Sequence, residues 1–379
     1  MKTDLVKGFK DYAGKEAQKR AQIKNIIVET FEQYGFEPAE TPIIEYEEFV
    51  KGNNSQDEAV RDVFKLKDRG KRKLALRYEF TFQLKRLAKN KKLPYKRYQI
   101  GPVFRDEPIR PGRTRQFIQC DADIIGSTIK DEAENFSIFK QILEKLKIES
   151  IIYINNRKLL NEILDKEKIK EKYKENIIRE LDKLDKLSKA EVKNNLKKYN
   201  AEFLVEILTK QEKDYENYSS YKEILELKKY CKLFKVEVEF KPFLARGFSY
   251  YTGTIFEVWS KKLPVSICGG GSYVINNNQS TGISFGFEPL MLLANLKIQP
   301  EKYLVVSLNQ DKKAIEIAQT LRKKQKNTTI YYGKPSKALE YANAYDIQKV
   351  IFIGEKEIKQ NKFKIKDMKT GKEKYISKI

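Results

Sequence analysis

The sequence predicts an α+β protein with antiparallel strands, a helical insertion and a smaller C-terminal α/β domain. Three observations support this prediction. Residues 95–107 and 116–126 read as alternating strands around a loop containing Pro, Gly and Arg, which is typical of a long antiparallel hairpin. Residues 160–232 are charged, nearly free of glycine and helical in pattern. From residue 301 onward short strands alternate with helices, which predicts a mostly parallel sheet.

The elements before the insertion follow from local patterns. Residues 15–36 have apolar residues at helical spacing and end at Gly35, a helix stop. Residues 38–49 are extended and contain two prolines. Residues 73–90 begin as a strand and turn helical after Thr81, and a helix at 131–146 precedes a strand at 148–156.

Within the insertion, one apolar stripe is expected to pack inward: Ile177, Ile178, Leu181 and Leu184. Strands resume at 234–240, 243–259 and 263–274. The C-terminal domain then reads as strand 302–308, helix 312–324, strand 327–333, helix 336–345 and strand 349–354. A hairpin at 362–376, turning at Thr370 and Gly371, closes the chain.

Composition narrows the class of protein. The 379 residues suffice for two or three domains, and a hydrophobic share of 40% can fill real cores. No apolar run is long enough to span a membrane, and the N-terminus is too polar for a signal peptide. The three cysteines, Cys120, Cys231 and Cys268, lack metal-ligand spacing. We therefore expect a reduced, cytoplasmic protein with no membrane partner, no disulfide and no protein-bound metal.

The charge and the histidine content bear on function. A net charge of +23 suits a partner with phosphates, because each neutralised phosphate releases a counterion. Compositional drift toward lysine is the alternative explanation. The chain contains no histidine, which excludes Ser-His triads, histidine metal sites and a histidine general base. Any catalysis has to rely on charge, orientation and carboxylates.

The first candidate cluster lies around the predicted hairpin loop. Arg105 and Glu107 face the same way on one strand, and Arg113 and Phe117 share a face of the returning strand. Two arginines, an acid and an aromatic ring could grip a polyphosphate and stack a flat base. An ordinary exposed hairpin with scattered charge is the alternative.

A second cluster is formed by Arg77, Glu79 and Thr81, which alternate onto one face. An acid beside a hydroxyl can receive an ammonium group, although an amphipathic edge strand has the same pattern.

The third cluster is Arg246, within an apolar, strand-like segment that also holds Tyr250 and Tyr251. A buried arginine requires an anionic partner, either a ligand or a structural salt bridge. Strand alternation predicts that the two tyrosines point to opposite faces, so that only one of them joins the arginine.

The fourth cluster combines the triple glycine at 269–271 with residues 282–290, GISFGFEPL. Glycines allow a backbone to approach a ligand closely, but they also form simple bends or bulges. Neither segment fits a P-loop or a dinucleotide fingerprint.

Together these clusters resemble a known family. Residues 104–117, FRDEPIRPGRTRQF, resemble motif 2 of class II aminoacyl-tRNA synthetases. Residues 244–257, LARGFSYYTGTIFE, are similar to the signature peptide of histidyl-tRNA synthetases, and residues 74–86 and 97–107 match that family too. Residues 179–192 are similar to the insertion of its archaeal and eukaryotic branch, and segments after 302 to its anticodon-binding domain.

The resemblance implies a domain organisation. Residues 1–160 and 233–298 would form the class II catalytic domain, an antiparallel sheet flanked by helices. Residues 161–232 would be the helical insertion and 301–379 the anticodon-binding α/β domain. Motif 1, the dimer-forming element, would fall around Pro42, which implies a homodimer.

The resemblance also implies roles for individual residues. Arg105 would hold the α-phosphate of ATP and the amino-acid carboxylate, and Arg246 would help to neutralise that phosphate. For the rest of ATP, Glu107 and Phe117 would contact adenine and Arg113 the outer phosphates. The implied histidine-binding residues are Glu79, Thr81 and Gln119 for the α-amino group, and Asp123 and Tyr251 for the imidazole.

The implied reaction has two steps. The carboxylate of L-histidine attacks ATP, giving histidyl-adenylate and pyrophosphate, and a terminal ribose hydroxyl of tRNA(His) then takes the histidyl group. Mg²⁺ would bridge phosphates with few protein ligands. Residues 109–113 would lie near the acceptor end of the tRNA.

Two segments depart from the family pattern. Motif 3 has the form Gly-x-Glu-Arg, and here Pro289 stands in place of the arginine. In the segment GGGSYV, Ser272 and Val274 replace two charged residues. The sequence is thus compatible with an active histidine–tRNA ligase and with a paralogue that binds histidine or tRNA as a regulator, like the synthetase-like regulatory subunit of ATP phosphoribosyltransferase.

Overall fold

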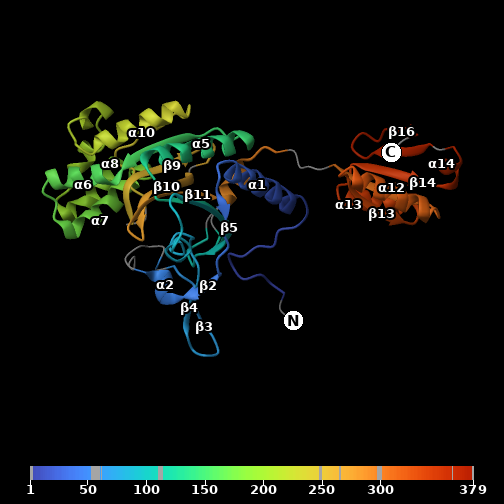
Figure 1. Ribbon diagram of the computed structural model, residues 1–379, viewed down its shortest axis with the longest axis horizontal. Coiled ribbons are helices and arrows are strands. Elements are labelled where there is room, and N and C mark those ends of the chain that lie inside the picture. The colour runs from blue at the N-terminus through green and yellow to red at the C-terminus, as the bar shows by residue number, and fades with distance from the viewer. Residues whose placement is uncertain are drawn as a thin grey trace. The chain divides into compact units, whose positions relative to one another are not determined.

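The computed structural model describes residues 3–52, 60, 62–109, 114–246, 250–263, 266–296, 301–360 and 362–377 (Figure 1). The chain divides into two compact units, which are considered separately. The larger comprises residues 1–11 and 23–296, and the smaller comprises residues 12–22 and 297–379.

An eight-stranded sheet forms the centre of the larger unit, in the order β1-β5-β6-β11-β10-β9-β7-β8. Its pairs are antiparallel except β1 with β5 and β7 with β8. The predicted hairpin is the β5–β6 pair, in register from Tyr95 opposite Ile125 to Phe104 opposite Gln116. The strands are β1 (Glu37–Pro38), β5 (Tyr95–Phe104), β6 (Gln116–Ile125), β7 (Ile151–Asn156), β8 (Glu239–Phe240), β9 (Tyr251–Trp259), β10 (Ser266–Ile275) and β11 (Asn278–Gly286).

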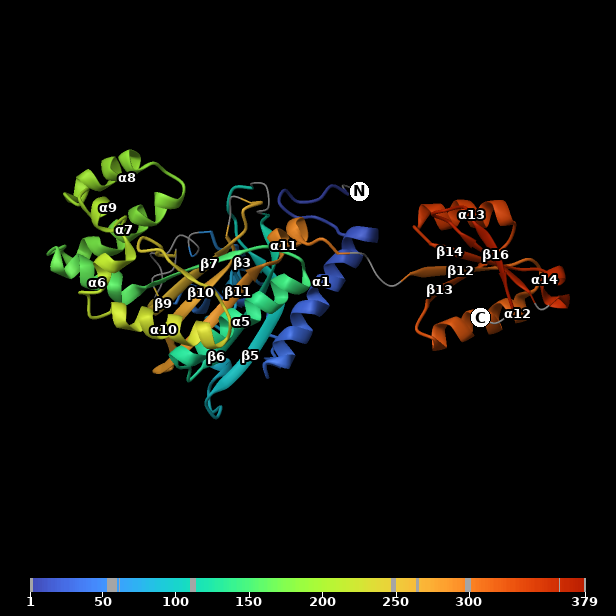
Figure 2. The ribbon, with the colours of Figure 1, turned by 90° about the horizontal axis from the view of Figure 1, so that it is seen from above.

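Helices α1 (Gly14–Gln33) and α5 (Ile129–Lys145) cover one face of this sheet (Figure 2). Aromatic side chains join the layers. Phe139 of α5 lies 5.1 Å from the Phe285 ring of β11 and 5.2 Å from the Phe256 ring of β9. Phe31 of α1 lies 6.4 Å from Phe285. Because side chains alternate along strands, the residues next to Phe256 and Phe285 point to the opposite face.

A small three-stranded sheet, β2-β4-β3, belongs to the same unit. It consists of β2 (Ile44–Tyr46), β3 (Lys65–Lys67) and β4 (Lys73–Leu76), accompanied by the short helices α2 (Glu47–Lys51) and α4 (Leu84–Leu87). The strand predicted to continue through Thr81 ends at Leu76. Arg77 instead turns inward and donates hydrogen bonds to the carbonyls of Thr41, at 2.6 Å, and Pro102, at 2.9 Å.

The insertion is helical, as the sequence predicts. It runs through α6 (Arg157–Lys166), α7 (Glu171–Leu181), the 3₁₀ turn η1 (Asp182–Asp185), α8 (Lys189–Leu196), η2 (Lys197–Tyr199), α9 (Leu204–Ile207), η3 (Glu212–Tyr215) and α10 (Tyr221–Leu233). The predicted stripe is confirmed, because Ile177, Ile178 and Leu181 are buried and Leu184 packs against them. Helix α10 packs along α5 and so joins the insertion to the sheet layer.

The smaller unit contains a five-stranded sheet in the order β13-β12-β14-β15-β16. The first three strands of this order are parallel and the last two add antiparallel, as predicted. Gly371 takes a positive φ of 70° in the closing hairpin. The elements are β12 (Lys302–Ser307), α12 (Asp311–Lys323), β13 (Asn327–Tyr332), α13 (Pro335–Ala344), β14 (Lys349–Ile353), α14 (Glu355–Lys359), β15 (Phe363–Asp367) and β16 (Glu373–Ile376).

The architecture confirms the predicted α+β class with a helical insertion and a C-terminal α/β fold. Cys120, Cys231 and Cys268 are free and buried. In the ranges that the structure describes, no helix is long and apolar enough to cross a membrane.

Candidate active site

The polar face of the large sheet, opposite α1 and α5, collects most of the residues singled out from the sequence. On β6, Gln119, Asp121 and Asp123 follow one another at every second position and share this face. The strand register sets Asp123 against Gly282 of β11, and Gln119 against Gly286. Strand β6 thus carries carboxylates on this face, and the neighbouring strand β11 has glycines opposite Gln119 and Asp123.

Three glycines leave room for functional side chains on this face. A Cβ at Gly269 would fall within the guanidinium of Arg246, and one at Gly282 would clash with the Asp123 carboxylate. A Cβ at Gly271 would stand 2.9 Å from the ring of Tyr251. The middle glycine of the triplet faces the other way, toward Phe256. The glycine-rich segment therefore makes space for Arg246, Tyr251 and Asp123, which favours the close-approach interpretation over a simple bend.

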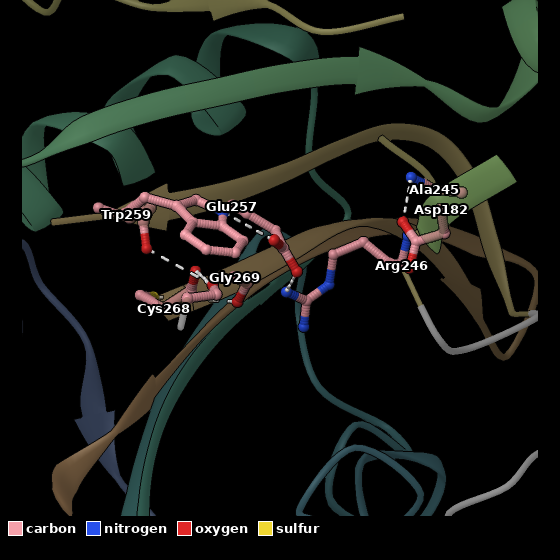
Figure 3. Close-up of polar contacts among 9 residues, drawn as sticks. Asp182, Ala245, Arg246, Glu257, Trp259, Cys268 and Gly269 are labelled. Carbon is pink, nitrogen blue, oxygen red and sulfur yellow. Dashed lines mark hydrogen bonds and ion pairs between the residues drawn. The ribbon is translucent and has the colours of Figure 1, made fainter. Parts of the chain in front are cut away.

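The Arg246 guanidinium lies over Gly269 and forms an ion pair with Glu257 (Figure 3). Its Nη1 donates to Glu257 Oε1 at 2.9 Å, and Trp259 Nε1 donates to Glu257 Oε2 at 2.9 Å. Burial lowers the pKa of Arg246, but Tyr251 and Glu257 raise it by more, so the guanidinium keeps its charge. Both side chains of the ion pair are only 17% exposed.

The strand predicted at 243–259 begins only at Tyr251. The prediction that Tyr250 and Tyr251 point to opposite faces is therefore wrong. Tyr250 and Tyr251 do not point to opposite sides: their ring centroids are 4.7 Å apart and their hydroxyl groups interact. Strand alternation does not apply, because Tyr250 precedes the strand. Burial and the nearby charge of Glu79 raise the pKa of Tyr250, whose hydroxyl also bonds to Thr81. Glu79, Thr81 and both tyrosines therefore meet.

Asp123 is engaged by two partners that the sequence analysis did not identify. Arg97 Nη2 lies 2.8 Å from Asp123 Oδ2, and both side chains are almost fully buried. The Tyr273 hydroxyl donates to Asp123 Oδ1. Burial raises the pKa of Asp123, and Arg97 opposes this effect. The network orients the carboxylate, in the way that outer partners orient functional acids.

Asp121 is a second buried carboxylate on the same strand face, and it was also missed. Gln119 Nε2 donates to Asp121 Oδ2 at 2.7 Å, and the hydroxyl of Ser284, opposite it on β11, also bonds to the Asp121 carboxylate. Burial and the neighbouring Asp123 raise the pKa of Asp121 to about 7. Strand periodicity could have revealed it, since it lies between two residues that were selected.

Arg105 and Phe117 come together at the end of the β5–β6 hairpin. Strand β5 ends at Phe104, but the Arg105 backbone still donates to the Arg115 carbonyl at 2.9 Å. The Arg105 guanidinium lies 5.1 Å from the centre of the Phe117 ring. Glu107 is half-buried nearby, and Arg113 lies outside the described residues. The contact between Arg105 and Phe117 favours the ligand-binding interpretation over an exposed hairpin with scattered charge.

The departures in the fourth cluster have structural explanations. Pro289 occupies the first turn of α11 (Phe287–Leu293), where a missing N–H is tolerated. Glu288 Oε1 accepts from the Ile118 backbone at 3.5 Å. Ser272 points to the helix-covered face and donates to the buried Glu132 of α5. Val274 is half exposed.

Most of the predicted site residues lie close together in the structure, whereas Arg77 does not join them. On or beside the polar sheet face it brings together Glu79, Thr81, Gln119, Asp123, Arg246 and Tyr251, with Arg105 and Phe117 farther along the same hairpin. Arg77 of the second cluster serves a structural role in backbone hydrogen bonding. No group of three or more His, Cys, Asp or Glu side chains suited to holding a metal ion occurs in the described part of the chain.

Comparisons with known proteins agree with this arrangement. The family model described as Histidyl-tRNA synthetase matches residues 8–290, and the one described as Anticodon binding domain matches residues 302–378. Histidine–tRNA ligase 1 of Bacillus cereus is 33% identical, with 97% of this chain and 96% of that protein covered.

Two solved structures share the fold. The histidyl-tRNA synthetase from Nostoc sp. PCC 7120 aligns with a TM-score of 0.87 and 24% identity, covering 99% of this chain and 97% of that one. A structure titled ATP phosphoribosyltransferase regulatory subunit/histidyl-tRNA synthetase, from Bacillus halodurans C, aligns with a TM-score of 0.76 and 21% identity, covering 92% and 98%.

The large, mostly antiparallel sheet with its flanking helices is the architecture of class II aminoacyl-tRNA synthetases, the class of the matched family and relatives. The chain belongs to the histidyl-tRNA synthetase family. The relatives named above are bacterial, so they do not support the predicted relationship to the archaeal and eukaryotic branch.

The raised pKa of Asp121 predicts a pH-dependent stability. The folded protein keeps this proton between about pH 4 and 7, where the unfolded chain has lost it, so the residue lowers stability as pH rises through that window. Relative to wild type, Asp121→Asn should therefore gain about 1–3 kcal/mol of unfolding free energy between about pH 4 and pH 8. Urea unfolding at several pH values measures this difference.

The exposed Glu149→Gln serves as the control and should follow the wild-type pH profile. A constant difference between Asp121→Asn and wild type across the pH range would contradict the assignment.

Proposed function

We propose that this protein ligates L-histidine to tRNA(His) with ATP, through a histidyl-adenylate. The observation that carries the proposal is the charged Arg246 held over Gly269 beside a cluster of phenols and carboxylates. Membership of the histidyl-tRNA synthetase family supports it, as does full-length similarity to a histidine–tRNA ligase. No observation specifically favours the regulatory alternative.

The histidine pocket is proposed to recognise two ends of the substrate. Glu79, Thr81 and Gln119 bind the α-amino group, because a carboxylate and polar oxygens suit an ammonium ion. Asp123 and Tyr251 bind the two imidazole nitrogens, which require an acceptor and a group that can donate or accept. The contacts of Asp123 with Arg97 and Tyr273 support this role, since they orient its carboxylate before the substrate arrives.

The ATP end is proposed to work by electrostatics. Arg105 neutralises the α-phosphate and the attacking carboxylate, and Arg246 adds charge where the transition state gains it. Phe117 stacks on adenine, Glu107 contacts it, and Arg113 reaches the outer phosphates. Neither step requires an imidazole, so the histidine-free composition is compatible with the chemistry.

Mg²⁺ is proposed to enter with ATP. An ion that bridges phosphates needs only one or two carboxylates from the protein. Glu107, which is half-buried and lies two residues after Arg105, would fit that requirement, although a complete acidic cluster is not found among the described residues. The ion would supply charge neutralisation, while the arginines orient the phosphates.

The second step requires tRNA. We assign residues 1–160 and 233–298 to the catalytic domain, 161–232 to the insertion and 301–379 to the anticodon-binding domain, with residues 109–113 near the acceptor end. The net charge of +23 and the match to an anticodon-binding domain support tRNA binding. Three buried thiols are compatible with a reduced cytoplasm.

A histidine-dependent ATP–pyrophosphate exchange assay tests the proposed function. The wild-type protein should catalyse exchange, although Pro289 stands in place of the motif 3 arginine. Arg246→Ala should lower the exchange rate about 100- to 1000-fold, the usual effect of removing one group that stabilises transition-state charge. Histidine binding, measured by calorimetry, should change by only a few fold.

Arg69→Ala removes an exposed arginine from the small sheet and should leave exchange unchanged. If the wild-type protein binds histidine but shows no exchange, the regulatory function is correct and the ligase proposal is wrong.

We propose that the protein forms a homodimer through the exposed apolar face of the small sheet. Ile44 and Tyr46 of β2 are 50% and 56% exposed, and Leu66 of β3 is 36% exposed. Register aligns these side chains on one face, with Leu74 of β4 between them. An apolar face of this kind on an edge strand suits burial against a second copy.

Light scattering at micromolar concentration should give the mass of two chains, about twice 44.5 kDa. Tyr46→Asp should shift the protein toward the monomer, because it would bury a charge in the interface. The exposed Tyr375→Asp in the smaller unit is the control. A wild-type monomer would contradict the proposal.

A further inference from the structure

The loop at residues 241–246, which ends in Arg246, is held by hydrogen bonds from two other segments. From β7, Asn155 Nδ2 donates to the carbonyls of Pro242, at 2.7 Å, and Leu244, at 2.8 Å. From the insertion, Asp182 Oδ1 accepts the backbone N–H groups of Ala245, at 2.9 Å, and Arg246, at 3.2 Å (Figure 3). One carboxylate oxygen therefore accepts hydrogen bonds from two successive backbone N–H groups.

Arg246 has an unusual backbone conformation that requires such support. Its φ is 65°, in the left-handed region that non-glycine residues seldom adopt. Conformations of this kind persist where the surroundings hold them, and they concentrate at functional sites. Hydrogen bonds from backbone N–H groups to a carboxylate are charge-assisted and strong. Asp182 supplies this support at the residue whose guanidinium lies on Gly269.

The same 3₁₀ turn of the insertion holds the other end of the loop. Asp185, at the end of η1, forms an ion pair with Lys241. The Lys241 ammonium also lies 4.5 Å from the centre of the Tyr153 ring and 5.5 Å from that of Trp259, the residue that donates to Glu257. The turn thus contacts the loop at Lys241 and at Arg246, with Asn155 holding the carbonyls between them.

We infer that Asp182 is a positioning residue for Arg246, through which the helical insertion sets the geometry of adenylate formation. The inference rests on the proposed function. The Asp182 carboxylate accepts hydrogen bonds from the backbone of Ala245 and Arg246, so it acts on the reaction through the arginine. Because these hydrogen bonds connect η1 to the Arg246 backbone, a change in the insertion that moves this turn would also displace the arginine.

The test compares three variants in the exchange assay. Asp182→Ala leaves two amides without their acceptor and should lower kcat about 10- to 100-fold, since a misplacement of about 1 Å at a reacting centre has effects of this size. The KM for histidine should stay within about 3-fold. Asp182→Asn keeps an oxygen that accepts both N–H groups and should retain kcat within about 5-fold.

Glu206→Ala is the matched control. It removes one negative charge from the same insertion, at an exposed residue paired with Lys193, and should leave kcat unchanged. If Asp182→Ala does not fold, as judged by thermal unfolding, Asp182→Ser replaces it, because the shorter hydroxyl does not reach both amides.

A double-mutant cycle separates positioning from general stability. In an Arg246→Ala background, Asp182→Ala should reduce exchange by less than about 2-fold, because no guanidinium remains to be positioned. An equal reduction in both backgrounds would overturn the inference, as would full kcat in the single variant. Absence of exchange by the wild-type protein would instead contradict the proposed function.

Discussion

The placement of one charged side chain, Arg246, over a glycine of the large sheet is the constraint on which the site depends. A buried guanidinium requires an acid, and Glu257 provides it at 2.9 Å. It also requires space, and Gly269 provides that because a Cβ there would overlap the guanidinium. The pairing of β9 with β10 sets Glu257 opposite Gly269, so the acid and the space for the guanidinium lie side by side. An ordinary central strand would fill this surface with branched side chains.

The site as a whole uses fixed charges instead of a proton relay. Arg97 and Tyr273 orient Asp123 at one end, and Glu257 and Asp182 hold Arg246 at the other. All of these partners belong to the protein itself, so the fixed charges do not depend on groups that the substrate brings. Such preorganisation can replace the imidazole groups that this chain lacks. Pro289 is compatible with this view, because the arginines assigned to the α-phosphate, Arg105 and Arg246, lie just after β5 and in the loop before β9.

Sequence patterns predicted those features of the fold that neighbouring residues determine. The β5–β6 hairpin, the stripe through Ile177 and Leu181, and the closing turn at Gly371 follow from alternation, helical spacing and glycine. Arg97 lies directly opposite Asp123 in this hairpin, so their contact follows from the strand register, which alternation alone does not fix. The contact of Asp182 with the loop before β9 joins residues far apart in the chain, so no periodicity reveals it. Tyr250 was predicted wrongly because strand alternation was extended beyond the start of the strand. The assignment of individual residues to ATP and histidine came from the family resemblance and stays a prediction.

The measurement that tests the central claim most directly is histidine-dependent pyrophosphate exchange by Gly269→Ala. The added methyl group would meet the end of a flexible side chain, so the protein should fold and Arg246 should shift. The account predicts a loss of at least about 10-fold in exchange rate with histidine affinity changed by only a few fold. Gly70→Ala, in an exposed turn of the small sheet, is the control. Full exchange by folded Gly269→Ala would contradict the account.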